Sequence, residues 1–198
     1  GVTPEAVRDQ MLADWPDLGP ITVMPPSDMD DEDGAVAQFS LECGNAIIIV
    51  TTMDSQFADD TAELCAGSRL WPDAATFDTD YQATTIVAVY FEDEDAADIA
   101  VRALLTQAMA SIIAVSNEAF VYWGDADHVI IPPLFREMAQ EILPNPPLYL
   151  WVAFNAGFRE GGEFASTTVG LDSLGLMDIE IPDSSKTPED TQEFILNL

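Results

Sequence analysis

The sequence predicts a single α+β domain spanning residues 1–198, in which helices pack on a mixed, largely antiparallel sheet. Apolar residues make up 48% of the chain, which is enough to bury a core. Strand and helix patterns are mixed along the sequence, and several strands are joined as hairpins. The most polar stretch, residues 27–34, is too short and too close to the N-terminus to be a linker between two domains.

The first elements carry strong local signals. Thr3-Pro4-Glu5 combines an N-cap, a proline at the first helical position and an acid in the first turn, and Pro16 ends the helix that it begins. Residues 35–41 alternate between apolar and polar, and residues 46–52 are a β-branched run. Because Gly44-Asn45 supplies a tight turn between them, these two segments are predicted to form a β-hairpin.

Two long apolar segments follow. Residues 84–91 are almost continuously apolar, which predicts a strand in the centre of the sheet. Residues 96–115 are apolar on most faces and predict a helix buried on that sheet. We expect no apolar run to be long enough to span a bilayer. The remaining expected elements are strands at 21–24, 119–123, 129–131, 148–154, 164–168 and 177–181, and helices at 59–67, 134–143 and 188–196.

The charge is strongly negative, with 36 acidic residues against six cations and a formal net charge of −30. The cations are scattered singly along the chain: Arg8, Arg69, Arg102, Arg136, Arg159 and Lys186. Without a basic patch, binding to a nucleic-acid backbone or to an anionic membrane is disfavoured. Three interpretations of the acidity remain: solubility in a salty environment, a surface for a basic partner protein, or a mimic of the DNA phosphate array. The arginines are expected to be structural ion-pair hubs.

The cysteines and the N-terminus point to a compartment. Cys43 and Cys65 are the only cysteines, and we expect both to be reduced and buried. The first residues lack the pattern of a signal peptide, although a leader removed before Gly1 is compatible with this start. The sequence therefore predicts a cytoplasmic protein of the bacterial type.

The acidic stretch from Asp28 to Gly34 was compared with a calcium-binding EF-hand loop. Placing Gly34 at the sixth loop position puts Met29 at the first and Ser40 at the twelfth, where oxygen ligands are needed. The pattern fails at both ends, so no metal site and no cofactor are predicted, and a solvated loop is the preferred interpretation. A structural protein stabilised by divalent cations stays as an alternative.

No catalytic constellation can be assigned. His128 is the only histidine, which excludes the usual catalytic zinc site, and the neighbouring aspartates are expected to favour its charged form in a loop. Trp71 and Trp123 lie beside predicted loops and are the aromatic residues most expected to line a groove or a partner surface. If the protein is an enzyme, four residues outline the candidate cleft: Arg69, Trp71, Trp123 and His128.

Several motifs together resemble a known family. They are Leu70-Trp71-Pro72-Asp73-Ala74, Val121-Tyr122-Trp123-Gly124, Pro132-Pro133 followed by Phe135, Leu150-Trp151-Val152, and Thr168-Val169-Gly170-Leu171 with Leu174 through Ile181. From about residue 33 to the C-terminus, the chain resembles the uncharacterised bacterial family catalogued as domain of unknown function 4261. The resemblance implies one compact bacterial domain and brings no activity or catalytic residue. The last block is interpreted as structural, with Gly170 and Gly175 bracketing a turn.

Function is therefore predicted from chemistry alone. The leading hypothesis is a non-enzymatic binding domain whose acidic surface takes a cationic partner, for instance a basic toxin or effector protein. The alternatives are an enzyme acting in the candidate cleft and the cation-stabilised structural protein.

Overall fold

The protein is described from a computed structural model, which defines residues 2–25, 35–57, 65, 68, 70–71, 81–93, 97–158, 162, 164–184, 187, 190 and 193–194. The predicted α+β class is confirmed, because helices combine with antiparallel sheets. The chain forms two compact units, which we describe separately. The first unit contains Gly1–Val121 and Val129–Pro146, and the second contains Tyr122–His128 and Pro147–Leu198.

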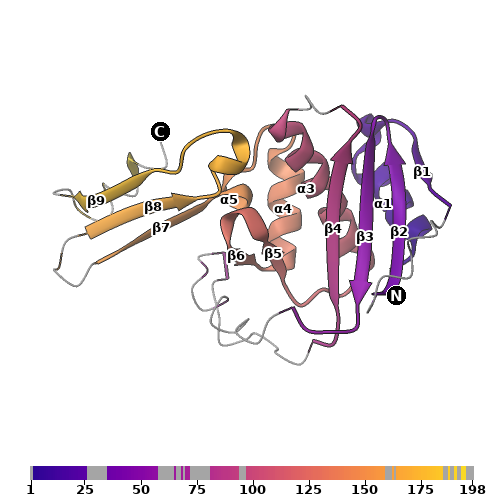
Figure 1. The fold of residues 1–198 in the computed structure, drawn as a ribbon, viewed down its shortest axis with the longest axis horizontal. Helices are drawn as coiled ribbons and strands as arrows, with labels where there is room; N and C mark the ends of the chain where they lie inside the picture. Colours follow the sequence, from indigo (N-terminus) through magenta and orange to yellow (C-terminus); the bar gives the residue numbers. More distant parts are fainter. Residues whose placement is uncertain are drawn as a thin grey trace. The chain divides into compact units, whose positions relative to one another are not determined.

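The first unit is built on a four-stranded antiparallel sheet with the strand order β1-β2-β3-β4 (Figure 1). The strands are β1 (Ile21–Val23), β2 (Ala35–Cys43), β3 (Ala46–Met53) and β4 (Thr84–Phe91). The predicted hairpin is confirmed, since β2 and β3 pair in register across a turn in which Gly44 has a φ of 63°.

The expectation of a central position for β4 is wrong, because β4 is the last strand in the order of the described sheet. Its residues Val87, Val89 and Phe91 pack against the core, whereas Ile86 and Tyr90 between them are exposed. A strand that is apolar on both faces thus has only one face covered, and the sequence pattern alone does not distinguish this from burial on both sides.

Helices cover one face of this sheet. Helix α1 (Pro4–Asp14) begins as predicted, with Thr3 Oγ1 accepting a hydrogen bond from the Ala6 amide at 3.3 Å, and a 3₁₀ turn, η1 (Pro16–Leu18), follows it. Helix α3 (Asp98–Val115) packs against α1, β4 and α4 (Pro132–Ile142). In Figure 1, α1 and α3 lie behind the sheet and α4 lies beside its β4 edge, and no described helix or strand lies in front of the sheet.

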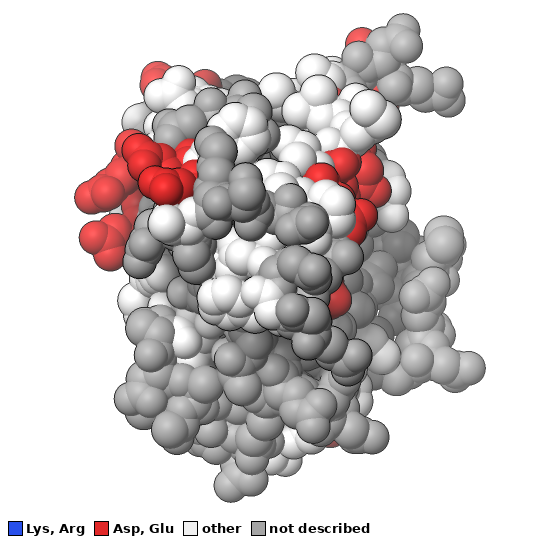
Figure 2. All heavy atoms as spheres, turned by 90° about the vertical axis from the view of Figure 1, so that its left-hand side faces the viewer, with Lys and Arg blue, Asp and Glu red and all other residues white. Residues whose placement is uncertain are grey.

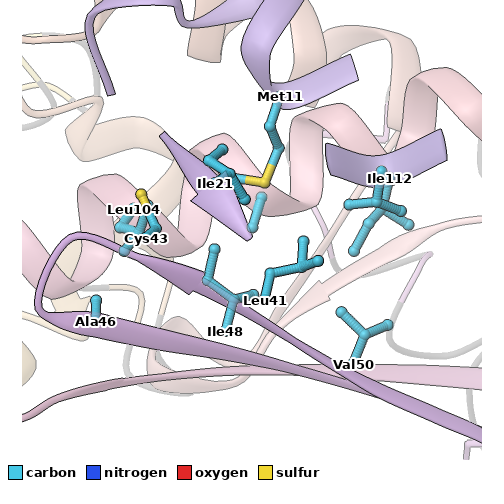
Figure 3. Close-up of a cluster of buried hydrophobic side chains, with 11 residues drawn as sticks. Met11, Ile21, Leu41, Cys43, Ala46, Ile48, Val50, Leu104 and Ile112 are labelled. Atoms are coloured by element: carbon cyan, nitrogen blue, oxygen red, sulfur yellow. The ribbon is translucent and has the colours of Figure 1, made fainter. Parts of the chain in front are cut away.

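The core lies between α1, α3 and the covered face of the sheet, where side chains from all three point toward one another (Figure 3). Its buried residues are Val7, Met11, Ile21, Leu41, Cys43, Ala46, Ile48, Val50, Leu104, Ala108 and Ile112. Burying each Val, Leu, Ile and Met side chain of this set stabilises the fold by about 1.5–3 kcal/mol.

Helix α3 corrects the expectation that no run could span a bilayer. Its 18 residues have a mean hydropathy of 1.5, so the helix is long and apolar enough to cross a membrane by length and composition. A core helix of a soluble protein passes the same test. In this structure α3 packs against two helices and one strand, and 33% of its residues are buried.

One arginine ties the three helices together, as the sequence predicted for its arginines. Arg136 of α4 donates to both carboxylate oxygens of Asp14, at 2.8 and 2.9 Å, and to the carbonyl of Ala110 in α3 at 2.8 Å. Burial raises the pKa of Asp14, but hydrogen bonds from Arg136 and Gln10 outweigh it and hold the pKa below its usual value. Such a two-pronged contact fixes geometry as well as charge.

The chain passes between the units in β5 (Val121–Trp123) and β6 (His128–Ile130), which pair as a two-stranded sheet around the 3₁₀ turn η3 (Gly124–Ala126). Helix α4 then begins at Pro132, two residues earlier than predicted. Proline needs no intrahelical hydrogen-bond acceptor in the first turn, so both prolines fit there.

The second unit contains helix α5 (Leu148–Trp151) and a three-stranded antiparallel sheet with the order β7-β8-β9. The strands are β7 (Ala153–Phe158), β8 (Phe164–Val169) and β9 (Glu180–Ser184), and η4 (Asp172–Leu174) is a 3₁₀ turn before β9. The predicted strand at 148–154 is wrong in its first half. The Pro147 carbonyl accepts from the Leu150 and Trp151 amides and starts a helical turn.

Three further expectations concern segments of which the structure describes few residues or none. The helices expected at 59–67 and 188–196 and the acidic stretch at 27–34 lie largely or wholly outside the described residues. The last expected strand, at 177–181, begins later, at Glu180, because residues 170–178 form a hydrogen-bonded loop.

Candidate functional site

The structure does not describe all four residues of the predicted cleft. Arg69 lies outside the described residues. Trp71 belongs to the first unit, and Trp123 and His128 belong to the second. The sequence predicts that both tryptophans line a groove or a partner surface. Both are buried, so neither ring is exposed for a partner. A shared cleft of these four residues stays a prediction.

His128 is held in a buried position in β6, not in a solvated loop. Its Nε2 lies 2.9 Å from the Leu150 carbonyl, which fixes Nε2 as the protonated nitrogen of the neutral ring. Burial lowers the pKa of His128, although the hydrogen bond to Leu150 and the charge of Asp127 act in the opposite direction. The expectation that the charged form is favoured is therefore wrong, because desolvation outweighs the neighbouring acid.

The thiols do not offer a nucleophile. Cys43 and Cys65 are both free and buried, as predicted. Burial raises the pKa of Cys65 to about 11 and raises the pKa of Cys43 in the same direction. Since the thiolate is the reactive form, both cysteines are inert near neutral pH.

The described acidic, histidine and cysteine side chains do not cluster as metal ligands do. Within that part of the chain, no group of three or more His, Cys, Asp or Glu side chains is placed to hold a metal ion. The acidic stretch from Asp28 to Gly34 is outside it. The cation-stabilised alternative therefore stays a prediction.

The block from Thr168 to Ile179 forms a closed loop, which agrees with its structural interpretation. The Asp178 carboxylate accepts hydrogen bonds from Thr168 Oγ1 at 2.9 Å and from the Gly170 and Leu171 amides at 3.4 and 3.1 Å. The Ile179 amide donates to Thr168 Oγ1 at 2.8 Å, which closes the loop on itself. Gly170 adopts a φ of 108°. A Cβ at this glycine would lie 2.7 Å from the Trp151 carbonyl oxygen.

The strongest candidate for a functional surface is the uncovered face of the β1–β4 sheet. Directly opposed residues share a face, and neighbours along a strand alternate between faces. Because Ile48 and its partners Leu41 and Val89 point into the core, the next residues along the strands point away from it. We call this the outer face. It consists of Gln38, Ser40, Glu42, Ile47, Ile49, Thr51, Ile86, Ala88 and Tyr90.

Apolar side chains are exposed on the outer face along β4. Ile86 is 50% exposed and Tyr90 is 60% exposed, and they lie opposite Thr51 and the half-buried Ile47. Polar side chains occupy β2, which lies on the other side of β3 from β4. There Gln38 Oε1 accepts a hydrogen bond from Thr51 Oγ1 of β3 at 3.3 Å. The face thus has an apolar side along β3 and β4 and a polar side along β2.

In the described segments 35–57 and 81–93, which build the outer face, every charged side chain is acidic. Glu42 lies on the face itself, and the exposed Asp54, Glu92 and Asp93 follow the ends of β3 and β4. Segments 35–57 and 81–93 contain no Lys, Arg or His. Acidic side chains are also conspicuous elsewhere. Figure 2 shows separate patches of Asp and Glu, and no Lys or Arg of the described residues is visible in that view.

Sequence reasoning missed the outer face. The apolar run 84–91 predicts a strand in the centre of the sheet, and the β-branched run 46–52 has no polar alternation that would indicate an exposed face. A signal was present, because Gln38, Ser40 and Glu42 alternate with core residues and predict an uncovered face on β2. Pairing β2 with β3 would have extended that uncovered face to Ile47 and Ile49.

Comparison with known proteins adds no relative: no protein-family model, no curated protein and no solved structure matches the chain.

Proposed function

We propose that this protein is a non-enzymatic binding domain that holds a basic partner protein on the outer face of its four-stranded sheet. One observation carries the proposal. Ile86 and Tyr90 are exposed on a face that has carboxylates on it and at its margin and no cation in the segments that build it. The free, buried thiols fit a reducing compartment, and we place the protein in the bacterial cytoplasm as part of the same proposal.

The two properties of the face have separate roles in binding. Removing apolar surface from water contributes about 25 cal/mol per Å², which favours covering Ile86 and Tyr90 with apolar side chains. Carboxylates around this area favour cationic neighbours and raise the rate of encounter. The net charge of −30 extends this attraction beyond the site, and salt screens it. The partner segment that fits is amphipathic, with apolar residues facing β4 and Lys or Arg at its edges.

The test is a selection of peptides from a random library on the immobilised full-length chain. We expect the enriched peptides to carry net positive charge and apolar residues, and their binding to weaken as NaCl rises from about 50 mM to about 500 mM. Enrichment of neutral or acidic peptides, of peptides insensitive to salt, or of none at all would contradict the proposal.

Matched variants locate the binding surface. The same selection is repeated with Ile86→Ser/Tyr90→Ser and with Ile99→Ser, since Ile99 is 48% exposed on α3 and not on the sheet. We expect the Ile99 variant to enrich the same peptides and the outer-face variant to lose them. Equal enrichment by both variants would show that the peptides bind elsewhere.

A further inference from the structure

The loop from Gly170 to Asp178 in the second unit presents two apolar side chains to solvent. Met177 is 88% exposed and Leu176 is 60% exposed, and the two are adjacent in the chain. Exposed apolar residues occur singly on many surfaces, but here one short loop carries two of them.

This loop is held by hydrogen bonds along its whole length. The Asp178 carboxylate holds the Gly170 and Leu171 amides, and Ser173 Oγ donates to the Gly170 carbonyl at 2.7 Å. Past the 3₁₀ turn, the Leu176 amide donates to the Leu171 carbonyl at 3.1 Å. The backbone that carries Leu176 and Met177 is thus bonded on both sides.

Gly170 anchors the same loop to the rest of its unit. An added Cβ there would lie within 3.2 Å of the Trp151 and Asp125 carbonyl oxygens, so the backbone of the loop packs directly on backbone. Gly175, with a φ of 74°, turns the chain just before the two exposed side chains. Because the backbone of this loop is already ordered, it loses little conformational entropy when a partner binds.

We infer that this loop is a preorganised anchor, which inserts Leu176 and Met177 into an apolar pocket of a basic partner protein. The inference rests on the proposed function for the chemistry of the partner. The loop adds a second contact with the partner, made by the second unit, whereas the outer face belongs to the first unit. Methionine is flexible and polarisable, so it fits pockets of irregular shape. In many interfaces a few side chains that enter a well-packed, desolvated pocket supply most of the binding energy.

The charge around the loop selects the partner. Asp172, Asp178 and Glu180 are exposed, and residues 164–184 contain no Lys, Arg or His. A pocket with Lys or Arg at its rim therefore complements the loop. An anionic lipid surface and a second copy of this strongly acidic chain are both repelled by it.

The experiment is affinity capture from an extract of cells that carry the gene, with the retained proteins identified by mass spectrometry. Full-length wild type is compared with Leu176→Ser/Met177→Ser, with the control Leu148→Ser, and with Ile86→Ser/Tyr90→Ser. Leu148 is an exposed leucine of the same unit. Each variant is first checked for an unchanged thermal melt, since the changed side chains are exposed.

We expect the loop variant to recover on the order of tenfold less of at least one basic protein, and Leu148→Ser to recover it as wild type does. Equal recovery by the loop variant overturns the inference. So does loop-dependent flotation with phosphatidylglycerol or phosphatidylcholine vesicles, or loop-dependent dimerisation in sedimentation, because the occupant is then a lipid or a second copy.

The two proposals fail in different ways in this experiment. If only the outer-face variant loses the basic protein, the loop is no anchor and the proposed function stands. If only the loop variant loses it, the outer face is not the binding surface. If wild type retains no basic protein, both proposals are contradicted.

Discussion

The two faces of the β1–β4 sheet are made from the same strands and from similar residues, yet they have opposite surroundings. Ile48 is fully buried against helices, whereas Ile86, one strand away on the other face, is half exposed. The difference lies in the second layer, since α1 and α3 pack on one face only. An apolar residue in a strand therefore contributes to stability only where another element covers it, and elsewhere it is available for binding.

The comparison is tested most strongly by one pair of substitutions. Ile48→Ala leaves a cavity in the core and should lower the free energy of unfolding by about 2–5 kcal/mol. Ile86→Ala removes a half-exposed side chain and should lower it by no more than about 1 kcal/mol, which is the cost of the lost cross-strand packing. Urea denaturation measures both. Similar losses for the two variants would mean that the outer face is covered in solution.

A second pair extends the contrast to the second unit, where a buried glycine supports an exposed loop. Gly170→Ala forces a Cβ against the Trp151 carbonyl at a φ of 108°, and we expect it to cost about 3 kcal/mol. Gly162→Ala meets nothing within 4 Å at a φ of 87°, so only the backbone strain remains, at about 1–2 kcal/mol. Thermal melts compare them, and equal shifts would argue against the close packing of Gly170.

The cost of removing a charged side chain also depends on whether the ion pair that it forms is buried or exposed. Arg136→Met removes the partner of the largely buried Asp14 and should cost about 2 kcal/mol. Arg8→Met breaks only the exposed pair with Asp9 and should cost no more than about 0.5 kcal/mol. Denaturant unfolding at neutral pH distinguishes the two, and an equally small loss for Arg136 would show that it is no hub.

The smallest expected effect is a pH dependence caused by His128. Its pKa is lowered by burial in the folded protein, so the unfolded chain binds the proton first as pH falls. The contribution of neutral His128 to the free energy of unfolding has its full value above the ordinary histidine pKa of about 6.5. As the pH falls from there to the pKa of the folded protein, this contribution decreases by at most about 1.4 kcal/mol per pH unit. His128→Gln should flatten the decline that begins below about pH 6.5. An unchanged slope in unfolding experiments would exclude His128 as its cause.

Parts of the fold with local signals were predicted correctly from the sequence. The N-cap at Thr3 and the turn at Gly44-Asn45 act over a few residues, and both elements form as predicted. The strand predicted at 148–154 is wrong over residues 148–151, because four apolar residues are too few to distinguish a helical from a strand period.

The features that bear on function depend on contacts between distant residues. His128 is buried and bonded to Leu150, which is 22 residues away in the chain. The outer face exists because α1 and α3 both pack on the opposite side of the sheet. The alternation on β2 is only a partial local signal for the outer face, and no local pattern shows that His128 is buried. The candidate surface was therefore missed, and the charged form predicted for the histidine was wrong.

The central claim is that stability and binding are divided between the two faces of one sheet. The most direct test is the Kd of an enriched cationic peptide for wild type and for Ile86→Ser/Tyr90→Ser, with Ile99→Ser as the control. We predict that the double variant weakens binding at least about tenfold, and that the control leaves it unchanged. An unchanged Kd for the double variant would contradict the division of roles and remove the outer face as the binding surface.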